Sequence, residues 1–128
     1  MFGNSPAFSG YSVDDQVVAK QFYSEVLGCT VDDDWMGLKL TFSNGHTVFI
    51  YQKNDHVPAT YTVLNFPVES IDAVVDKLAD NGIVMERYDN MPAPQDEKGI
   101  LRGKDASMGP NIAWFRDPAG NILSVLEN

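Results

Sequence analysis

Hydrophobic residues follow a helical period in some stretches of this chain and a strand-like pattern in others, and both patterns occur in each half. Apolar residues recur at intervals of three or four residues in two places, as on one face of a helix. These positions are Val18, Phe22 and Val26 in the first half, and Ile71, Val74, Val75 and Leu78 in the second. We therefore predict two amphipathic helices, one in each half.

Both predicted helices carry start and stop signals. Asp15 precedes the first apolar run and Ser70 precedes the second, and each side chain can accept hydrogen bonds from the free N–H groups of a first turn. Gly28 and Gly82 follow the two runs, where a helix commonly ends in a left-handed residue. These signals place the boundaries of both helices.

The rest of the apolar pattern indicates strands and hairpin turns. We predict strands at residues 7–13, 29–31, 36–42, 47–52, 60–68, 83–88, 111–116 and 122–126, and an acidic turn at residues 32–34. Asn44-Gly45 is a strong short hairpin signal, and Asp117-Pro118-Ala119-Gly120-Asn121 combines a proline that presets φ with a glycine that permits positive φ.

The two halves repeat one order of elements, namely strand, capped helix, glycine, strand and hairpin. We expect one domain over residues 1–128, with module one at about residues 5–55 and module two at about residues 59–128. The extra length of the second half falls on residues 89–109, a loop rich in proline, glycine and charge that we take as a lid candidate. This order alone also permits ferredoxin-like folds.

Two motifs resolve that ambiguity by resemblance. The stretch DQVVAKQFYSEVLG at residues 15–28 resembles the first helix of the vicinal-oxygen-chelate class, which includes glyoxalases, bleomycin-resistance proteins and extradiol dioxygenases. The stretch FRDPAGNILSVLE at residues 115–127 resembles the closing hairpin of that class. The resemblance implies an α+β fold of two tandem βαβββ modules whose mixed sheets form cups, with ligand or metal inside. Fold alone does not define the chemistry.

The resemblance also implies where a metal would bind. Metal-dependent members usually supply a His from the first strand of each module and a Glu or Gln from the last. These positions project onto Phe8, Val63, Ser124 and the neighbourhood of Phe49, and these side chains make no divalent metal site. We therefore expect no metal and no cofactor. The two histidines, His46 in a hairpin and His56 in a linker, are expected to be solvated.

Members without metal ligands, such as the bleomycin-resistance type, act by binding, which makes a small-molecule cleft the first hypothesis. Strand alternation and position suggest wall residues for it, and Arg102 in the lid candidate could clamp a carboxylate or phosphate. The candidate ligand-binding residues are Phe8, Phe49, Tyr51, Val63, Asn65, Arg102, Trp114 and Ser124. For Phe49 and Val63 the alternative is ordinary core packing.

Charge and cysteine content narrow the partners and the compartment. Eighteen acidic residues against nine Lys and Arg give a net charge of −9, which repels nucleic acid and attracts cationic ligands. No stretch is long and apolar enough to span a membrane. Cys29 stands alone, so no internal disulfide forms, and we expect a reduced cytoplasmic setting with an inert, buried thiol.

Two other hypotheses stay open at this point. The protein could be a glyoxalase-like lyase or dioxygenase-like enzyme that uses Tyr51, Asn65, Arg102 or Asp105 for acid–base work without a metal, or a metalloenzyme with displaced ligands. In each case we expect a homodimer, because cupped sheets expose apolar faces and strand edges.

Overall fold

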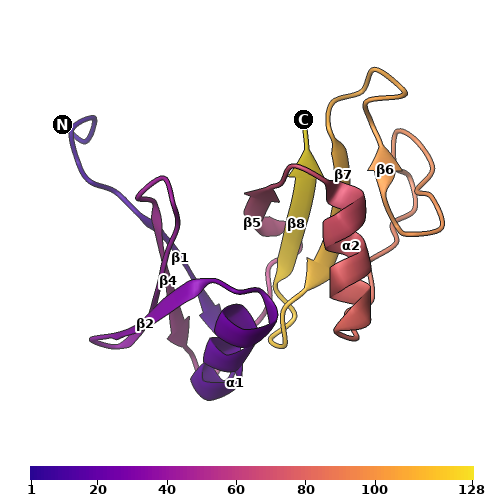
Figure 1. Cartoon of the computed structure of the whole chain (residues 1–128). Helices are drawn as coiled ribbons and strands as arrows, with labels where there is room; N and C mark the ends of the chain where they lie inside the picture. The colour runs from indigo at the N-terminus through magenta and orange to yellow at the C-terminus, as the bar shows by residue number, and fades with distance from the viewer. The chain divides into compact units, whose positions relative to one another are not determined.

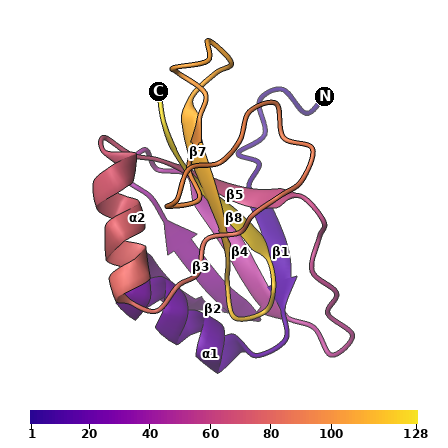
Figure 2. The same ribbon diagram turned by 90° about the vertical axis from the view of Figure 1, so that its right-hand side faces the viewer.

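The computed structural model describes residues 1–128, which fall into two units, residues 1–58 and residues 59–128 (Figure 1). Each unit contains one four-stranded mixed sheet and one main helix. Figure 2 shows the chain from a second direction. This confirms the predicted α+β architecture of two βαβββ-like modules.

Sheet 1 belongs to the first unit. Its elements are β1 (Ser9–Val13), α1 (Gln16–Gln21) continuing into a π-helical turn η1 (Phe22–Val26), β2 (Thr30–Asp34), β3 (Gly37–Thr41) and β4 (Thr47–Gln52). The strand order is β1-β4-β3-β2, in which β1 runs parallel to β4 and the other pairs are antiparallel.

Sheet 2 belongs to the second unit and repeats this plan. Its elements are β5 (Thr62–Pro67), α2 (Ile71–Asp80), β6 (Leu101–Arg102), β7 (Asn111–Arg116) and β8 (Ile122–Glu127). The strand order is β5-β8-β7-β6, again with one parallel pair, β5 with β8.

The predicted capping residues and helix-ending glycines are found at the ends of both helical segments. The Asp15 carboxylate accepts hydrogen bonds from the backbone N–H groups of Val17 and Val18, at 3.0 and 3.2 Å. Ser70 caps α2 in the same way, and the Glu127 carboxylate also accepts from the Ile71 N–H at 2.9 Å. Both helix-ending glycines adopt positive φ, 71° at Gly28 and 80° at Gly82.

Each helix covers one face of its own sheet and buries an apolar core there. In the first unit α1 packs on β3 and β4, and the core includes Ala19, Tyr23, Leu38, Leu40, Val48 and Ile50. In the second unit α2 packs on β7 and β8, and the core includes Ile71, Val75, Leu78, Phe115, Leu123 and Val125. Successive strand residues point to opposite faces, so the residues between these core positions lie on what we call the helix-free face of each sheet.

Two predicted elements differ from the structure. Residues 32–34 are not a turn but the end of edge strand β2, where Asp32 pairs with Lys39 and the turn falls on Trp35 and Met36. An edge strand tolerates consecutive carboxylates because they stay in water. Residues 83–88 form no strand, since their one backbone hydrogen bond to sheet 2 is that of the Glu86 N–H, which donates to the Trp114 carbonyl at 2.8 Å.

The segment predicted as a loop over residues 89–109 is partly built into the second unit. It contains β6 and a single bridge between Gln95 and Leu101, and the side chains of Ile100 and Leu101 are buried. Residues 95–102 are therefore anchored to sheet 2, and only residues 89–94 and the turns around residue 105 resemble the free loop that we expected.

Candidate functional site

Aromatic side chains line the helix-free face of sheet 1. Strand register places Gly10, Phe49 and Lys39 in one row across β1, β4 and β3. On the same face, two residues further along β4, Tyr51 pairs with Ser12 of β1. The rings of Phe49 and Tyr51 stack with centroids 5.8 Å apart and an interplanar angle of 19°. Phe49 and Tyr51, two of the predicted ligand-binding residues, thus form one continuous aromatic surface.

Glycine makes room for this surface. A Cβ atom at Gly37 would stand 2.3 Å from the Ile50 carbonyl oxygen and 3.0 Å from Cζ of Phe49, both shorter than ordinary contacts. A Cβ atom at Gly10 would stand 2.9 Å from the Phe49 carbonyl oxygen. The Phe49 ring can therefore lie close to the β3 backbone only because no side chain exists at residue 37.

A hollow of about 340 Å³ opens on this face. It is lined by Phe8, Asp34, Trp35, Lys39, Thr47, Val48 and Phe49. Phe8 is 63% exposed and Trp35 is 90% exposed, so two large aromatic side chains stand in solvent beside the hollow. Phe8 and Phe49 are among the predicted ligand-binding residues, but Trp35 was missed, because the turn was predicted at residues 32–34 and falls instead on Trp35 and Met36.

One ammonium group and one carboxylate set the charge at the hollow. The other two lysines of the first unit are paired, Lys20 with Asp33 and Lys53 with Asp55, whereas Lys39 has no ion-pair partner. Asp34 accepts a hydrogen bond from the Trp35 N–H at 2.7 Å and so fixes the start of the turn. A bound molecule would therefore meet aromatic rings, one cation and one anion.

The two histidines differ in their surroundings. His46 is exposed in the β3–β4 turn, as predicted. His56 is half-buried rather than fully solvated, because its Nδ1 atom shares a hydrogen bond of 2.7 Å with the Ser12 hydroxyl on β1. This bond ties the linker after β4 back to the strand at the edge of sheet 1.

The helix-free face of sheet 2 carries a second group of predicted residues. Asn65, Ser124 and Trp114 occupy one row across β5, β8 and β7. The Ser124 hydroxyl donates to Oδ1 of Asn65 at 2.6 Å, which orients the amide so that its N–H groups remain available as donors. Val63 lies at an irregularity in the register between Thr62 and Leu64.

Tyr88 packs against this face through Trp114, although no pattern in the sequence predicts it. Its ring packs edge-on against Trp114, with centroids 5.5 Å apart and an interplanar angle of 76°. The Tyr88 hydroxyl is buried and has no hydrogen-bond partner. Burial raises the pKa of Tyr88, and the nearby Glu86 carboxylate raises it further, so the group stays a neutral hydroxyl at physiological pH.

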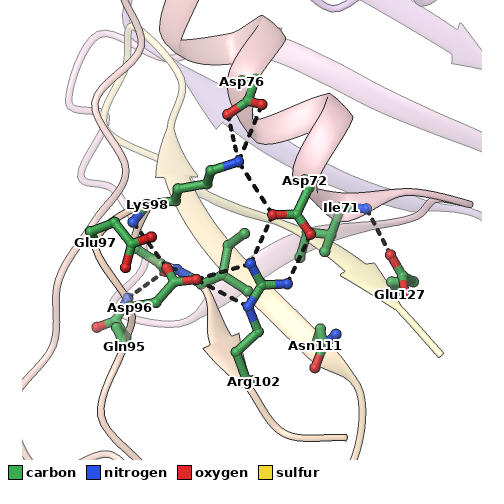
Figure 3. Close-up of polar contacts among 12 residues, drawn as sticks. Ile71, Asp72, Asp76, Gln95, Asp96, Glu97, Lys98, Arg102, Asn111 and Glu127 are labelled. Carbon is green, nitrogen blue, oxygen red and sulfur yellow. Dashed lines mark hydrogen bonds and ion pairs between the residues drawn. The ribbon is translucent and has the colours of Figure 1, made fainter. Parts of the chain in front are cut away.

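Arg102 lies on the other side of sheet 2, against helix α2 (Figure 3). Its guanidinium donates to both oxygens of Asp72, at 2.9 and 2.8 Å, and to Asp96 at 3.0 Å. These hydrogen bonds hold the pKa of Asp72 well below its usual range and raise that of Arg102. The structure thus separates Arg102 from Trp114 and Ser124, and its predicted role as a clamp stays untested.

The lysine next to this pair extends the same network. Lys98 reaches Asp72 at 3.3 Å and Asp76 at 3.0 Å, so α2 is tied to the segment that follows Gln95 by two cations (Figure 3). Two cations and three carboxylates, including Asp96, face one another across this contact, and the network keeps one net negative charge. This network of ion pairs fixes residues 95–102 on the helix side of the second unit.

The donor set does not fit the divalent metal that the fold class often carries. The projected positions hold Phe8, Phe49, Val63 and Ser124, and the Ser124 hydroxyl is already bonded to Asn65. No three His, Cys, Asp or Glu side chains gather into a group that could hold a metal ion. Burial raises the pKa of the Cys29 thiol to about 11, so a thiolate ligand is disfavoured as well.

Membrane insertion of a helix also finds no basis in the structure. Neither helix has the length and apolar character needed to cross a bilayer.

Several solved structures share this fold. A glyoxalase family protein from Enterococcus faecalis is 23% identical, with a TM-score of 0.68 and coverage of 99% of this chain and 100% of that one. TnmS3, an antibiotic binding protein from Streptomyces sp. CB03234, is 20% identical, with a TM-score of 0.65 and 97% coverage of both chains. The fosfomycin resistance protein FosX from Listeria monocytogenes is 12% identical, with a TM-score of 0.69 and coverage of 98% and 93%.

Sequence comparison adds the family itself. No curated protein sequence matches the chain significantly. A sequence profile of the Glyoxalase/Bleomycin resistance protein/Dioxygenase superfamily, however, matches residues 8–125, a span that includes every strand of both units except the C-terminal end of β8. With the repeated βαβββ modules and this match, the chain belongs to the glyoxalase/bleomycin resistance protein/dioxygenase superfamily.

Proposed function

We propose that this protein binds a small, planar organic molecule on the helix-free face of sheet 1 and does so without a metal ion. The observation that carries the proposal is the hollow of about 340 Å³ with Phe8, Trp35 and Phe49 in its walls. Small-molecule sites are typically concave and mostly apolar, with few polar groups that fix orientation. Lys39, Asp34 and Thr47 supply such groups here.

The energetics favour a ligand that covers the exposed rings. Each Å² of apolar surface removed from water contributes about 25 cal/mol, and aromatic side chains add a preference for stacked or edge contacts. Trp35 and Phe8 have most of their surface available for such burial. A planar molecule that lies on Phe49 and reaches both side chains therefore gains most of its affinity from stacking.

The comparison with solved structures agrees with binding as a function of this fold. TnmS3 carries the description of an antibiotic binding protein and FosX that of a fosfomycin resistance protein. At 20% and 12% identity these likenesses define the fold, and the ligand of this chain rests on its own residues. In our proposal Tyr51 extends the aromatic surface, and Asn65, Trp114 and Ser124 form a second ligand-contacting face on sheet 2.

Chemical-shift mapping tests the proposal. Coumarin, a planar bicyclic probe, is titrated into the ¹⁵N-labelled protein, and we expect the largest shifts at the residues around the hollow, namely Trp35, Lys39 and Phe49. Trp35→Ala should weaken this response at least threefold. The matched control is Tyr61→Ala, which removes another exposed ring (69% exposed) that does not line the hollow and should leave the response unchanged.

Two results would contradict the proposal, one for the location of the site and one for binding without a metal ion. Shifts absent from sheet 1, or an equal loss of binding in Tyr61→Ala, would remove the hollow as the site. Stoichiometric zinc, iron or manganese in untagged protein would overturn the metal-free part of the proposal and restore the lyase or dioxygenase alternative.

A further inference from the structure

The hydroxyl of Tyr88 is the one buried side-chain polar atom in this structure without a hydrogen-bond partner. Buried polar groups are nearly always bonded, because an unmade hydrogen bond in the interior loses the one that water would provide. A buried hydroxyl without a hydrogen bond therefore calls for an explanation. A hydrogen-bond partner on a bound ligand would provide one.

Contacts with Gln95 and Trp114 restrain both the backbone and the ring of Tyr88. The side chain of Gln95 accepts from the Tyr88 N–H at 2.8 Å and donates to the carbonyls of Glu86 and Gly99, at 3.0 and 2.7 Å. The ring packs edge-on against Trp114. Backbone and ring are thus both fixed, and the position of the hydroxyl follows from them.

The neighbours of Tyr88 have the character of a recognition surface. Trp114 offers a flat indole on the helix-free face of sheet 2, and it shares a row with Ser124 and Asn65. The Asn65 amide is oriented by the Ser124 hydroxyl, which leaves its N–H groups as donors on the same face. Tyr88 and Asn65 therefore supply hydrogen-bond donors near one stacking platform.

We propose that the Tyr88 hydroxyl is a specificity-determining group, which donates a hydrogen bond to the carbonyl oxygen or ring nitrogen of a planar aromatic ligand packed on Trp114. This inference rests on the proposed small-molecule function and names the ligand class, an aromatic molecule with a hydrogen-bond acceptor. The hydroxyl is closed to solvent without ligand, so binding displaces the atoms above it. In our proposal the segment that moves is residues 89–94, which follow Tyr88 directly and form no helix or strand.

Tyr88→Phe separates recognition from structure, because it removes only the hydroxyl. We expect this variant to melt at or above the wild-type temperature, since an unsatisfied buried group disappears. We expect it to bind coumarin, which carries a carbonyl acceptor, about tenfold more weakly, as the loss of one hydrogen bond implies. Indene, a bicyclic hydrocarbon without an acceptor, should bind wild type and variant equally.

Tyr61→Phe is the matched control, because it removes an exposed hydroxyl from the same unit and should change neither melting nor binding. Equal coumarin affinity of wild type and Tyr88→Phe, measured by titration of the Trp114 indole N–H signal, overturns the inference. So does a lower melting temperature with unchanged binding, which would reveal a structural partner such as a bound water.

The two proposals fail in different ways. If coumarin shifts signals around Trp35 and Phe49 but not the Trp114 indole, the inference about Tyr88 is wrong and the site on sheet 1 stands. If coumarin shifts neither group, both are wrong.

Discussion

Gly37→Ala is the substitution that connects the fold to the proposed site most closely. The added Cβ atom would stand 2.3 Å from the Ile50 carbonyl oxygen and 3.0 Å from Cζ of Phe49. An ordinary contact is at least 3.4 Å, so β3 and β4 must separate locally by about 1 Å, in the range where overpacking of a core costs about 1–3 kcal/mol. The strands involved pair Leu38 with Ile50, both fully buried, so the strain falls on the centre of sheet 1.

The same substitution should disturb the aromatic surface. The Phe49 ring has to move away from residue 37, which breaks its stacking on Tyr51 and changes the floor of the hollow. We therefore expect Gly37→Ala to lower the melting temperature by several degrees, as about 1–3 kcal/mol does for a domain of this size, and to weaken coumarin binding as well.

Thermal unfolding followed by circular dichroism measures the first effect, and the shift titration measures the second. Gly3→Ala is the matched control, because a Cβ atom there meets nothing within 4 Å and φ is not positive. Equal melting temperatures for Gly37→Ala and wild type would refute the close approach of Phe49 and Ile50 to residue 37, and with it the explanation of the flat aromatic floor.

Three further predictions concern the turns, the ion pairs and the assembly. Gly120→Val should lower the melting temperature more than Gly45→Val. Both residues have positive φ, 86° and 82°, but the turn at Gly120 also contains the buried Asp117–Asn121 hydrogen bonds. Equal melting temperatures for the two variants would count against a stabilising role of these hydrogen bonds. Asp72→Asn should destabilise the protein by up to about 1 kcal/mol at pH 7, because the pair with Arg102 is half-exposed. Since folding lowers the pKa of Asp72, the stabilisation by this ion pair is present above the ordinary carboxyl pKa and fades as the pH falls below it. A loss of stability in Asp72→Asn that becomes larger at acid pH would contradict this pH dependence. Light scattering should give a homodimer of about twice 14.2 kDa, because β1, β2, β5 and β6 are all sheet edges, and a stable 14.2 kDa species at micromolar concentration would exclude it.

Local chemistry explains which elements could be predicted from the sequence. The caps at Asp15 and Ser70 and the turn that ends at Asn121 depend on residues within a few positions of each other, and all three form as predicted. Phe49 and Tyr51 share a face because strand alternation alone requires it.

The predictions that differ depend on contacts between distant residues. Residues 83–88 have a strand-like composition, but the Gln95 side chain takes the hydrogen bonds that a neighbouring strand would have taken. Arg102 faces α2 because β6 pairs Arg102 with Asn111, a register that no local pattern encodes. The orphan hydroxyl of Tyr88 depends on the packing of its ring on Trp114, and its sequence neighbourhood carries no trace of it.

A crystal structure of untagged protein soaked with coumarin tests directly whether the hollow on sheet 1 binds a planar molecule without a metal ion. We expect density for the probe against the Phe49 ring and beside Trp35, in a hollow whose residues keep their positions, with no metal ion at Phe8, Val63 or Ser124. Density for the probe only on the helix side of sheet 2, next to Arg102 and Asp72, or a metal ion coordinated at those three positions, would contradict it.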